Sequence, residues 1–149
     1  MNLKRLSANT LILLSSIIFG IFTCELAARF LGLGNPLLYK SDSLVGYRLR
    51  PNQSKQRTKN ASVSTDSEGF RADPSVKDDS LSDVFVFVGD SVTYGGTYID
   101  DSELFSSIFC ANKTKSICLN AGINGWGTYN MGRFISNFSL YSKRIPSEF

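Results

Sequence analysis

One stretch decides the fold of this chain, Val84-Phe85-Val86-Phe87-Val88 followed directly by Gly89-Asp90-Ser91. Five consecutive β-branched or aromatic residues without a polar interruption predict a strand that is buried on both faces, as in a parallel sheet between two layers of helices. The strand ends at a glycine, and Ser91 follows at its carboxyl end, where open α/β sheets bind their ligands. The stretch therefore predicts an α/β fold that presents a serine hydroxyl to a substrate.

The glycines around this serine bear on its role. Gly89, Gly95 and Gly96 loosen the backbone on both sides of Ser91. A catalytic nucleophile needs such a place, because its hydroxyl must reach the substrate while backbone N–H groups stay free for an oxyanion. The other interpretation is an ordinary strand-to-helix turn in which the serine caps the helix.

The residues after this turn predict a second strand and two helices. Asp100 and Glu103 have the spacing of a capping box, which predicts a helix start, and residues 116–119 predict a short parallel strand. A second helix is expected to begin near Thr128, and right-handed crossovers then bring the loops after the two strands to one crevice. The apolar residues expected to pack these helices on the sheet are Leu104, Phe105, Ile108, Phe109, Met131, Phe134, Ile135, Phe138 and Tyr141.

The loop after the second strand, residues 120–128, is rich in glycine. Gly122, Gly125 and Gly127 either permit a tight turn or let a backbone N–H approach an oxyanion with no side chain in the way. Trp126 is either a hydrophobic plug of the loop or a platform for an acyl chain or sugar ring.

The amino-terminal residues predict a membrane anchor. Residues 6–24 are 19 positions without a charge, and as a helix they span ~28 Å, close to the hydrocarbon thickness of a bilayer. Lys4 and Arg5 precede this run, which favours a cytoplasmic amino terminus and a translocated remainder. A cleaved signal peptide is the rival, although Glu25 and Leu26 stand where a cleavage site needs small residues. A buried helix of a soluble protein is the third interpretation.

Residues 33–82 predict an extended polar arm rather than a second core. Glycine and proline interrupt this segment, and residues 44–49 and 61–65 have the composition of short edge strands. A solvated face that guards a strand edge is one interpretation of its basic residues, and a surface for anionic lipid headgroups or an acidic glycan is the other. These basic residues, which no acid interrupts, are Arg48, Arg50, Lys55, Arg57 and Lys59.

The composition argues against a nucleic-acid-binding protein and against a metal or cofactor site. The 149 residues leave room for one domain and an anchor, and the net charge of +3, without a basic cluster interleaved with aromatic residues, gives no indication of nucleic acid binding. The chain has three cysteines and no histidine. It thus lacks the commonest metal ligand, and we expect neither a metal nor a cofactor. Cys110 and Cys118 are expected to be buried free thiols, with a disulfide as the alternative in an oxidising compartment.

Together these features resemble the SGNH (GDSL-type) hydrolases. Gly89-Asp90-Ser91 after one hydrophobic strand and residues 120–128 after the next are similar to the first two signature blocks of that family, and the arm is similar to that of membrane-anchored bacterial members. The resemblance implies an incomplete flavodoxin-like three-layer α/β/α sandwich. We expect an anchor in residues 1–32, the arm in 33–82 and the first part of the α/β domain in 83–149.

The resemblance also implies roles for individual residues. Ser91 is expected to be the nucleophile, and the N–H groups of Ser91 and Gly125 are expected to hold the oxyanion. Asp90 is expected to hold the turn instead of acting as a base, and Tyr94 and Trp126 to contact the substrate. The remaining residues expected to support the site are Gly89, Asn120, Gly122 and Asn124.

Two further blocks of the family are absent from this sequence. No Gly-x-Asn-Asp follows Tyr141, and there is no histidine for an Asp-x-x-His. Loss of a triad member lowers turnover by roughly 10⁴ to 10⁶-fold, so we expect this chain to be nearly inert and interpret it as the amino-terminal part of a truncated enzyme. Half a sandwich is expected to leave apolar surface and a strand edge exposed.

The sequence thus predicts a single-pass protein of the cell membrane whose domain, on the periplasmic or extracellular side, hydrolyses an O-acyl ester of a glycan or lipid. An O-acetyltransferase of the same fold is one alternative. A non-catalytic anchored module that binds a glycan or partner through the Trp126 loop and the basic arm is another. A flavodoxin-like nucleotide site is disfavoured, because the chain has no G-x-G-x-x-G or Walker pattern.

Overall fold

The computed structural model describes residues 3–31, 33, 35–56, 61–72, 83–113 and 116–142, with side chains from Ser7 onward. The chain forms two compact units, Met1–Asn35 and Pro36–Phe149. The first unit contains the predicted anchor. The second contains nearly all of the predicted arm together with the predicted α/β domain.

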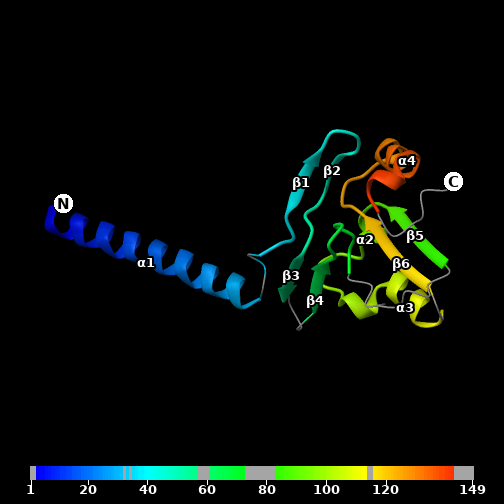
Figure 1. Ribbon diagram of the computed structural model, residues 1–149. Coiled ribbons are helices and arrows are strands. Elements are labelled where there is room, and N and C mark those ends of the chain that lie inside the picture. Colours follow the sequence, from blue (N-terminus) through cyan, green and yellow to red (C-terminus); the bar gives the residue numbers. More distant parts are fainter. Residues whose placement is uncertain are drawn as a thin grey trace. The chain divides into compact units, whose positions relative to one another are not determined.

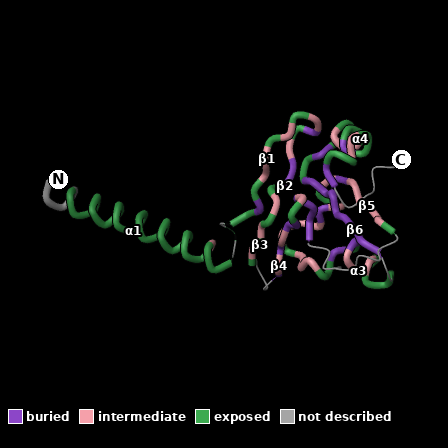
Figure 2. The backbone as a smooth tube through the Cα atoms, viewed as in Figure 1, coloured by how far each residue is buried: buried purple, intermediate pink, exposed green. Residues whose placement is uncertain are grey.

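The first unit is a single long helix, α1 (Leu3–Phe30). Its portion Ser7–Phe30, 24 residues long, is apolar enough to cross a membrane, and at the rise of an α-helix it measures about 36 Å. Figure 2 shows its described residues exposed almost throughout. A helix of this length and composition agrees with the expected membrane anchor in its coarse form.

The sheet of the second unit pairs the two predicted strands in parallel. Strand β5 (Asp83–Gly89) lies beside β6 (Ser116–Gly122), in a register that runs from Asp83 opposite Ser116 to Gly89 opposite Gly122. Strand β6 is longer than predicted, because it continues through residues 120–122, which were expected to be loop. The carboxyl ends of both strands lie at the same edge of the sheet, as expected (Figure 1).

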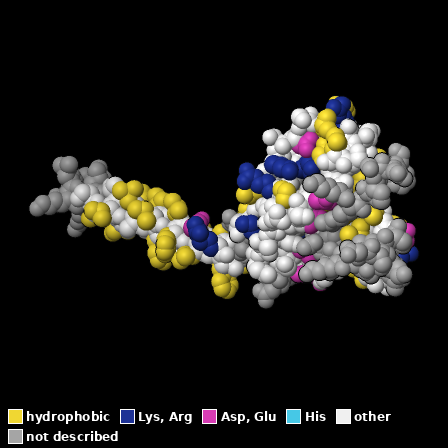
Figure 3. All heavy atoms as spheres, in the orientation of Figure 1, with side chains coloured by type: hydrophobic (Ala, Val, Ile, Leu, Met, Phe, Trp, Pro, Cys, Tyr) yellow, Lys and Arg dark blue, Asp and Glu magenta, His cyan; other side chains and the backbone are white. Residues whose placement is uncertain are grey.

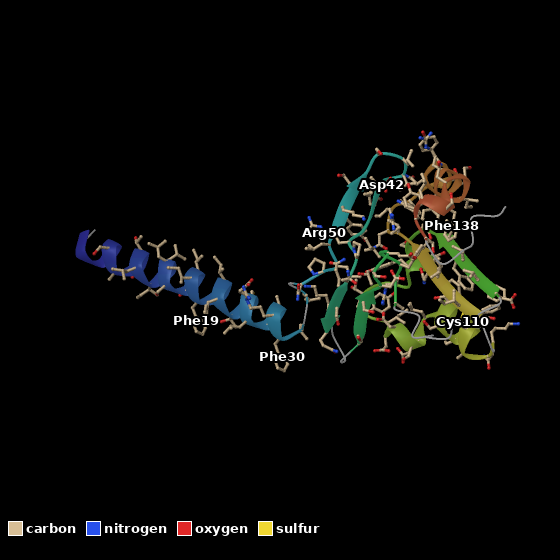
Figure 4. The ribbon with its side chains drawn as sticks, viewed as in Figure 1. Phe19, Phe30, Asp42, Arg50, Cys110 and Phe138 are labelled. Carbon is tan, nitrogen blue, oxygen red and sulfur yellow. A yellow bond between two sulfur atoms is a disulfide. The ribbon has the colours of Figure 1, made fainter. Side chains whose placement is uncertain are left out.

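A helix covers each face of this sheet. Side chains alternate along β5, so that Phe85 and Phe87 contact Phe105 and Phe109 of α3 (Phe105–Ala111) at ring separations of 5.1 to 5.6 Å. The valines of β5 face the opposite side and pack against the core that contains α4 (Thr128–Ser136). Cys110 of α3 and Phe138 after α4 lie on opposite sides of the sheet in Figure 4. This arrangement confirms a mixed α/β fold.

The prediction that residues 84–88 are fully buried is wrong. All five are half-buried, whereas every residue of β6 is buried (Figure 2). The reason is the position of each strand. Strand β6 has β5 on one side and an antiparallel bridge from Arg71 to Asn120 on the other, whereas the only described strand that pairs with β5 is β6.

The predicted arm contributes to the same core as the sheet. It forms two antiparallel hairpins, β1 (Tyr39–Asp42) with β2 (Gly46–Leu49) and β3 (Gln53–Gln56) with β4 (Ser62–Thr65). Both strands expected in residues 44–49 and 61–65 are present. Leu49 and Val63 are fully buried, and Phe70 packs edge-on against Phe134. The polar composition of this segment therefore reflects the outward faces of hairpins whose inward faces are apolar.

The expectation of free thiols at two cysteines is wrong. Cys110, near the end of α3, and Cys118 of β6 form a disulfide with their Cα atoms 5.9 Å apart. A short connection returns the chain from α3 to β6, which brings the two residues within bonding reach. Cys24 in α1 is free and exposed.

Short helices connect these elements. Helix α2 (Ser91–Tyr94) follows β5, and the 3₁₀ helix η2 (Asp101–Glu103) begins with the predicted capping box at Asp100 and leads into α3. Helix α4 begins at Thr128, as predicted, but ends at Ser136, and the 3₁₀ helix η3 (Phe138–Leu140) follows. Of the apolar residues expected on the sheet, Ile108 and Ile135 are exposed instead, and Phe105 and Phe109 are also exposed although their rings contact β5.

We expect Asp100, the cap of η2, to make the free energy of unfolding depend on pH below about 4. Hydrogen bonds from the Ser102 hydroxyl and from the N–H groups of Ser102 and Ser62 lower the pKa of Asp100 from 3.8 to about 2. The unfolded chain therefore takes up a proton at a higher pH than the folded chain, so the free energy of unfolding falls as the pH falls from about 4 to about 2. Asp100→Asn should lose less stability over this interval, as measured by urea midpoints at pH 5, 3.5 and 2.5. Parallel curves for the two proteins would contradict this assignment.

Candidate functional site

Ser91 is the first residue of helix α2, directly after β5. Asp90 caps this helix, since its side chain accepts a hydrogen bond of 2.9 Å from the N–H of Val92. Asp90 thus holds the turn between β5 and α2, and Ser91 is not the cap. Ser91 is exposed, and neither its Oγ nor its N–H forms a hydrogen bond within the described part of the chain.

The loops after the two strands pack directly on each other. The N–H of Ile123 donates to the carbonyl of Gly89 at 3.0 Å. Gly122 lies so close to α2 that a Cβ atom there would stand 2.1 Å from the backbone nitrogen of Tyr94. Gly89 is similarly close to the Thr93 side chain. These glycines permit close approach, so the prediction that both loops meet at one edge is confirmed.

The side chain of Asn120 connects the two loops by hydrogen bonds. It is buried in β6, and its Nδ2 donates to the carbonyl of Thr93 at 2.8 Å and to the Ser106 hydroxyl at 3.0 Å. Its Oδ1 accepts from the N–H of Gly122 at 2.9 Å. The side chain therefore ties β6 to both α2 and α3.

Gly125 and Asn124 form the exposed tip of the second loop. Gly125 has a φ of +80°, a left-handed conformation that favours glycine. Its N–H has no hydrogen-bond partner among the described residues. The Tyr47 hydroxyl donates to the carbonyl oxygen of Asn124 at 2.7 Å, which fixes the peptide group between Asn124 and Gly125.

Tyr94 and Trp126, expected to contact the substrate, are core residues. They are 1% and 4% exposed. Trp126 packs on Phe134 at a ring separation of 5.5 Å, and its Nε1 donates to the carbonyl of Tyr47 at 3.0 Å. Trp126 is therefore the plug of its loop, and neither ring presents a platform to a ligand. Trp126 is joined to the β1–β2 hairpin by its hydrogen bond to Tyr47, whereas Tyr94 lies against Gly122 and the Arg71 guanidinium.

The contacts of the β1–β2 hairpin with the second loop and α4 were not predicted from the sequence. Asn130 Nδ2 donates to the carbonyl of Val45 at 2.9 Å, and Arg133 Nε to that of Leu44 at 3.0 Å. The Tyr141 hydroxyl donates to Asp42 at 3.0 Å. These partners are 85 to 99 positions apart in the chain. Local patterns give no signal for contacts across such separations.

Arg71 is a second feature that sequence reasoning did not assign. Its guanidinium is buried, forms an ion pair with Asp101 and donates to the carbonyl of Ile99 at 3.1 Å. Burial lowers the pKa of Arg71. Its backbone N–H donates to the carbonyl of Asn120 at 2.8 Å. Arg71 therefore ties the segment after the hairpins to β6 and to the loop before α3.

One cavity of the second unit does not have Ser91 in its described lining. It has a volume of about 520 Å³, and its described lining includes Ser62, Arg71, Asp101, Ser106 and Cys118. Within the described ranges, no group of three or more His, Cys, Asp or Glu residues is placed to hold a metal ion.

The groups at the carboxyl edge of the sheet include a hydroxyl and backbone N–H donors. An exposed hydroxyl without a hydrogen-bond partner, that of Ser91, stands on one loop, and unpaired backbone N–H groups stand on both loops. Such a set suits attack on a carbonyl carbon with support for the oxyanion. The chain has no histidine to serve as the base.

Comparison of the sequence with protein-family models and with curated proteins gives no match.

Proposed function

We propose that this chain is a membrane-anchored serine hydrolase of the SGNH type, acting on an ester such as an O-acyl group of a glycan or lipid. The observation that carries the proposal is the exposed Ser91, whose Oγ has no hydrogen-bond partner in the described residues and which stands at the carboxyl end of β5. The second glycine loop packs against the turn that presents it.

The reaction is acyl transfer through a covalent intermediate. Ser91 Oγ attacks the acyl carbonyl and loses its proton, and the N–H groups of Ser91 and Gly125 donate to the oxygen that becomes negative. Collapse of the tetrahedral intermediate releases the alcohol and leaves an acyl ester on Ser91, which water then cleaves. The base that accepts the serine proton comes from outside these 149 residues, because they include no histidine.

Three features support a location outside the cytoplasm. Helix α1 is long and apolar enough to cross a membrane, and Lys4 and Arg5 at its start favour a cytoplasmic amino terminus. The Cys110–Cys118 disulfide in the second unit is of the kind that persists in oxidising compartments. We therefore place the domain on the periplasmic or extracellular side of the cell membrane.

The proposal predicts that Ser91 can be acylated when a base is supplied. The full chain in detergent is incubated with an aryl acetate and imidazole, and intact-protein mass spectrometry follows the addition of one acetyl group. We expect acetylation at Ser91 in the wild type, because the added imidazole accepts the proton that the serine loses as it attacks the ester. Ser91→Ala should reduce the acetylation rate by at least about 100-fold.

The matched control is Ser139→Ala, which removes an exposed serine outside the site. It should be acetylated as fast as the wild type. Equal acetylation of wild type and Ser91→Ala would contradict the proposed function. If the acetyl group of the wild-type intermediate moves to an added oligosaccharide faster than to water, the activity is that of an O-acetyltransferase.

A non-catalytic binding module is the second candidate. Figure 3 shows Lys and Arg side chains gathered over the β1 to β3 segment. Of the basic residues expected on the arm, Arg50 is exposed and Lys55 is half-buried, whereas Arg48 is buried. Arg57 and Lys59 lie outside the described residues. Figure 4 places Arg50 at the end of the first hairpin opposite to Asp42. Retention of the protein on an acidic glycan, with no change in Ser91→Ala and no acetylation of Ser91, would favour this candidate.

A further inference from the structure

We propose that Tyr47 is a positioning residue that orients the N–H of Gly125 toward the oxyanion, an inference that rests on the proposed function. The Tyr47 hydroxyl donates a hydrogen bond of 2.7 Å to the carbonyl oxygen of Asn124, 77 positions away in the chain. That carbonyl belongs to the same peptide group as the N–H of Gly125. Tyr47 therefore acts on the backbone of the second loop from a hairpin outside the sheet.

The hydrogen bond to the Asn124 carbonyl also fixes the direction of the Gly125 N–H, because both groups belong to one planar peptide. The C=O and N–H of a trans peptide point in opposite directions, and the described residues contain no cis peptide bond. Because Tyr47 holds the carbonyl, the N–H of Gly125 points away from the hairpin. It is also unpaired within the described residues. A donor that is fixed before the reaction stabilises a developing charge without reorganisation.

Further contacts fix Tyr47 itself. Its carbonyl accepts the hydrogen bond from the buried Trp126 Nε1 at 3.0 Å, so Tyr47 and the loop are joined in both directions. Its ring packs edge-on against Tyr39 at 5.7 Å. A Cβ atom at Gly125 would stand 2.8 Å from the Tyr47 hydroxyl. Glycine at this position therefore serves two purposes, since it permits the left-handed φ and admits the tyrosine.

The test compares Tyr47→Phe with Tyr141→Phe in the full chain. The Tyr141 hydroxyl donates to Asp42 on the same hairpin, so this control loses one hydrogen bond of the hairpin but not the one to Asn124. Acetylation of Ser91 by an aryl acetate with imidazole is measured over a range of ester concentrations. For Tyr47→Phe we expect the maximal rate to fall by about 10-fold or more, with an unchanged half-saturating ester concentration.

A second readout does not depend on the reaction. The amide signal of Gly125 in NMR spectra should shift in Tyr47→Phe and stay in place in Tyr141→Phe, and urea midpoints check that both variants are folded. Wild-type rates and an unmoved Gly125 signal in Tyr47→Phe would overturn the positioning role while the proposed function stands. Equal losses of rate in both variants would also overturn it. Failure of the wild type to be acetylated would overturn the proposed function and this inference with it.

Discussion

Gly122→Ala is expected to lower the free energy of unfolding of the second unit by about 3 kcal/mol or more. A Cβ atom at this position would stand 2.1 Å from Tyr94 N, 2.5 Å from Thr93 C and 2.6 Å from Tyr94 Cα. All three are backbone atoms of α2, so no side-chain rotation can relieve the overlap. Either β6 or α2 must move, and a displacement of α2 carries Ser91 with it.

The measurement is urea unfolding in detergent, followed by the fluorescence of Trp126, which is the single tryptophan of the chain and is buried. The matched control is Gly132→Ala in helix α4, where a Cβ atom meets nothing within 4 Å. The control should raise stability by up to about 1 kcal/mol, because glycine is unfavourable inside a helix. Similar effects of the two substitutions would contradict the close packing of α2 on β6.

Arg71→Met is expected to lower the free energy of unfolding by about 3 to 5 kcal/mol. Methionine keeps much of the length of the side chain but removes the charge that faces Asp101 and the donor to the carbonyl of Ile99. The carboxylate of Asp101 would then stay partly buried without its ion-pair partner. Breaking one side of a buried pair costs more than the pair itself contributes, because the remaining charge is left desolvated.

Arg50→Met is the control for this prediction. Arg50 is exposed and donates one hydrogen bond of 3.2 Å to the carbonyl of Tyr39. Its replacement should change the free energy of unfolding by no more than about 1 kcal/mol. A loss below about 1 kcal/mol for Arg71→Met would show that the buried pair carries little of the stability of this unit.

The sequence predicted those elements whose signals are local. The apolar run of β5, the capping box at Asp100 and the start of α4 at Thr128 each depend on residues within a few positions of each other. Their order then predicted two parallel strands with both loops at one edge, because the handedness of crossovers restricts the topology. The positions of Asp90 and Asn120 beside the site follow from the same pattern.

Features that depend on distant residues could not be predicted in this way. The burial of Trp126 requires the β1–β2 hairpin, whose Tyr47 lies 79 positions before it. The partial exposure of β5 depends on which strands stand beside it, and the hydrophobicity of its own residues does not show this. The disulfide depends on the short return from α3 to β6, which the spacing of Cys110 and Cys118 left open.

The hydrogen bond from Tyr141 to Asp42 closes a separation of 99 positions, and this has a consequence for folding kinetics. Contacts between distant residues form only after long loops have closed, and loop closure costs conformational entropy. Folding rates therefore fall as contact order rises. The second unit should therefore fold slowly and in one cooperative step, after the hairpins and α4 are both available. The hairpins, which are synthesised first, would therefore lack these contacts until α4 and the residues that follow it have been made.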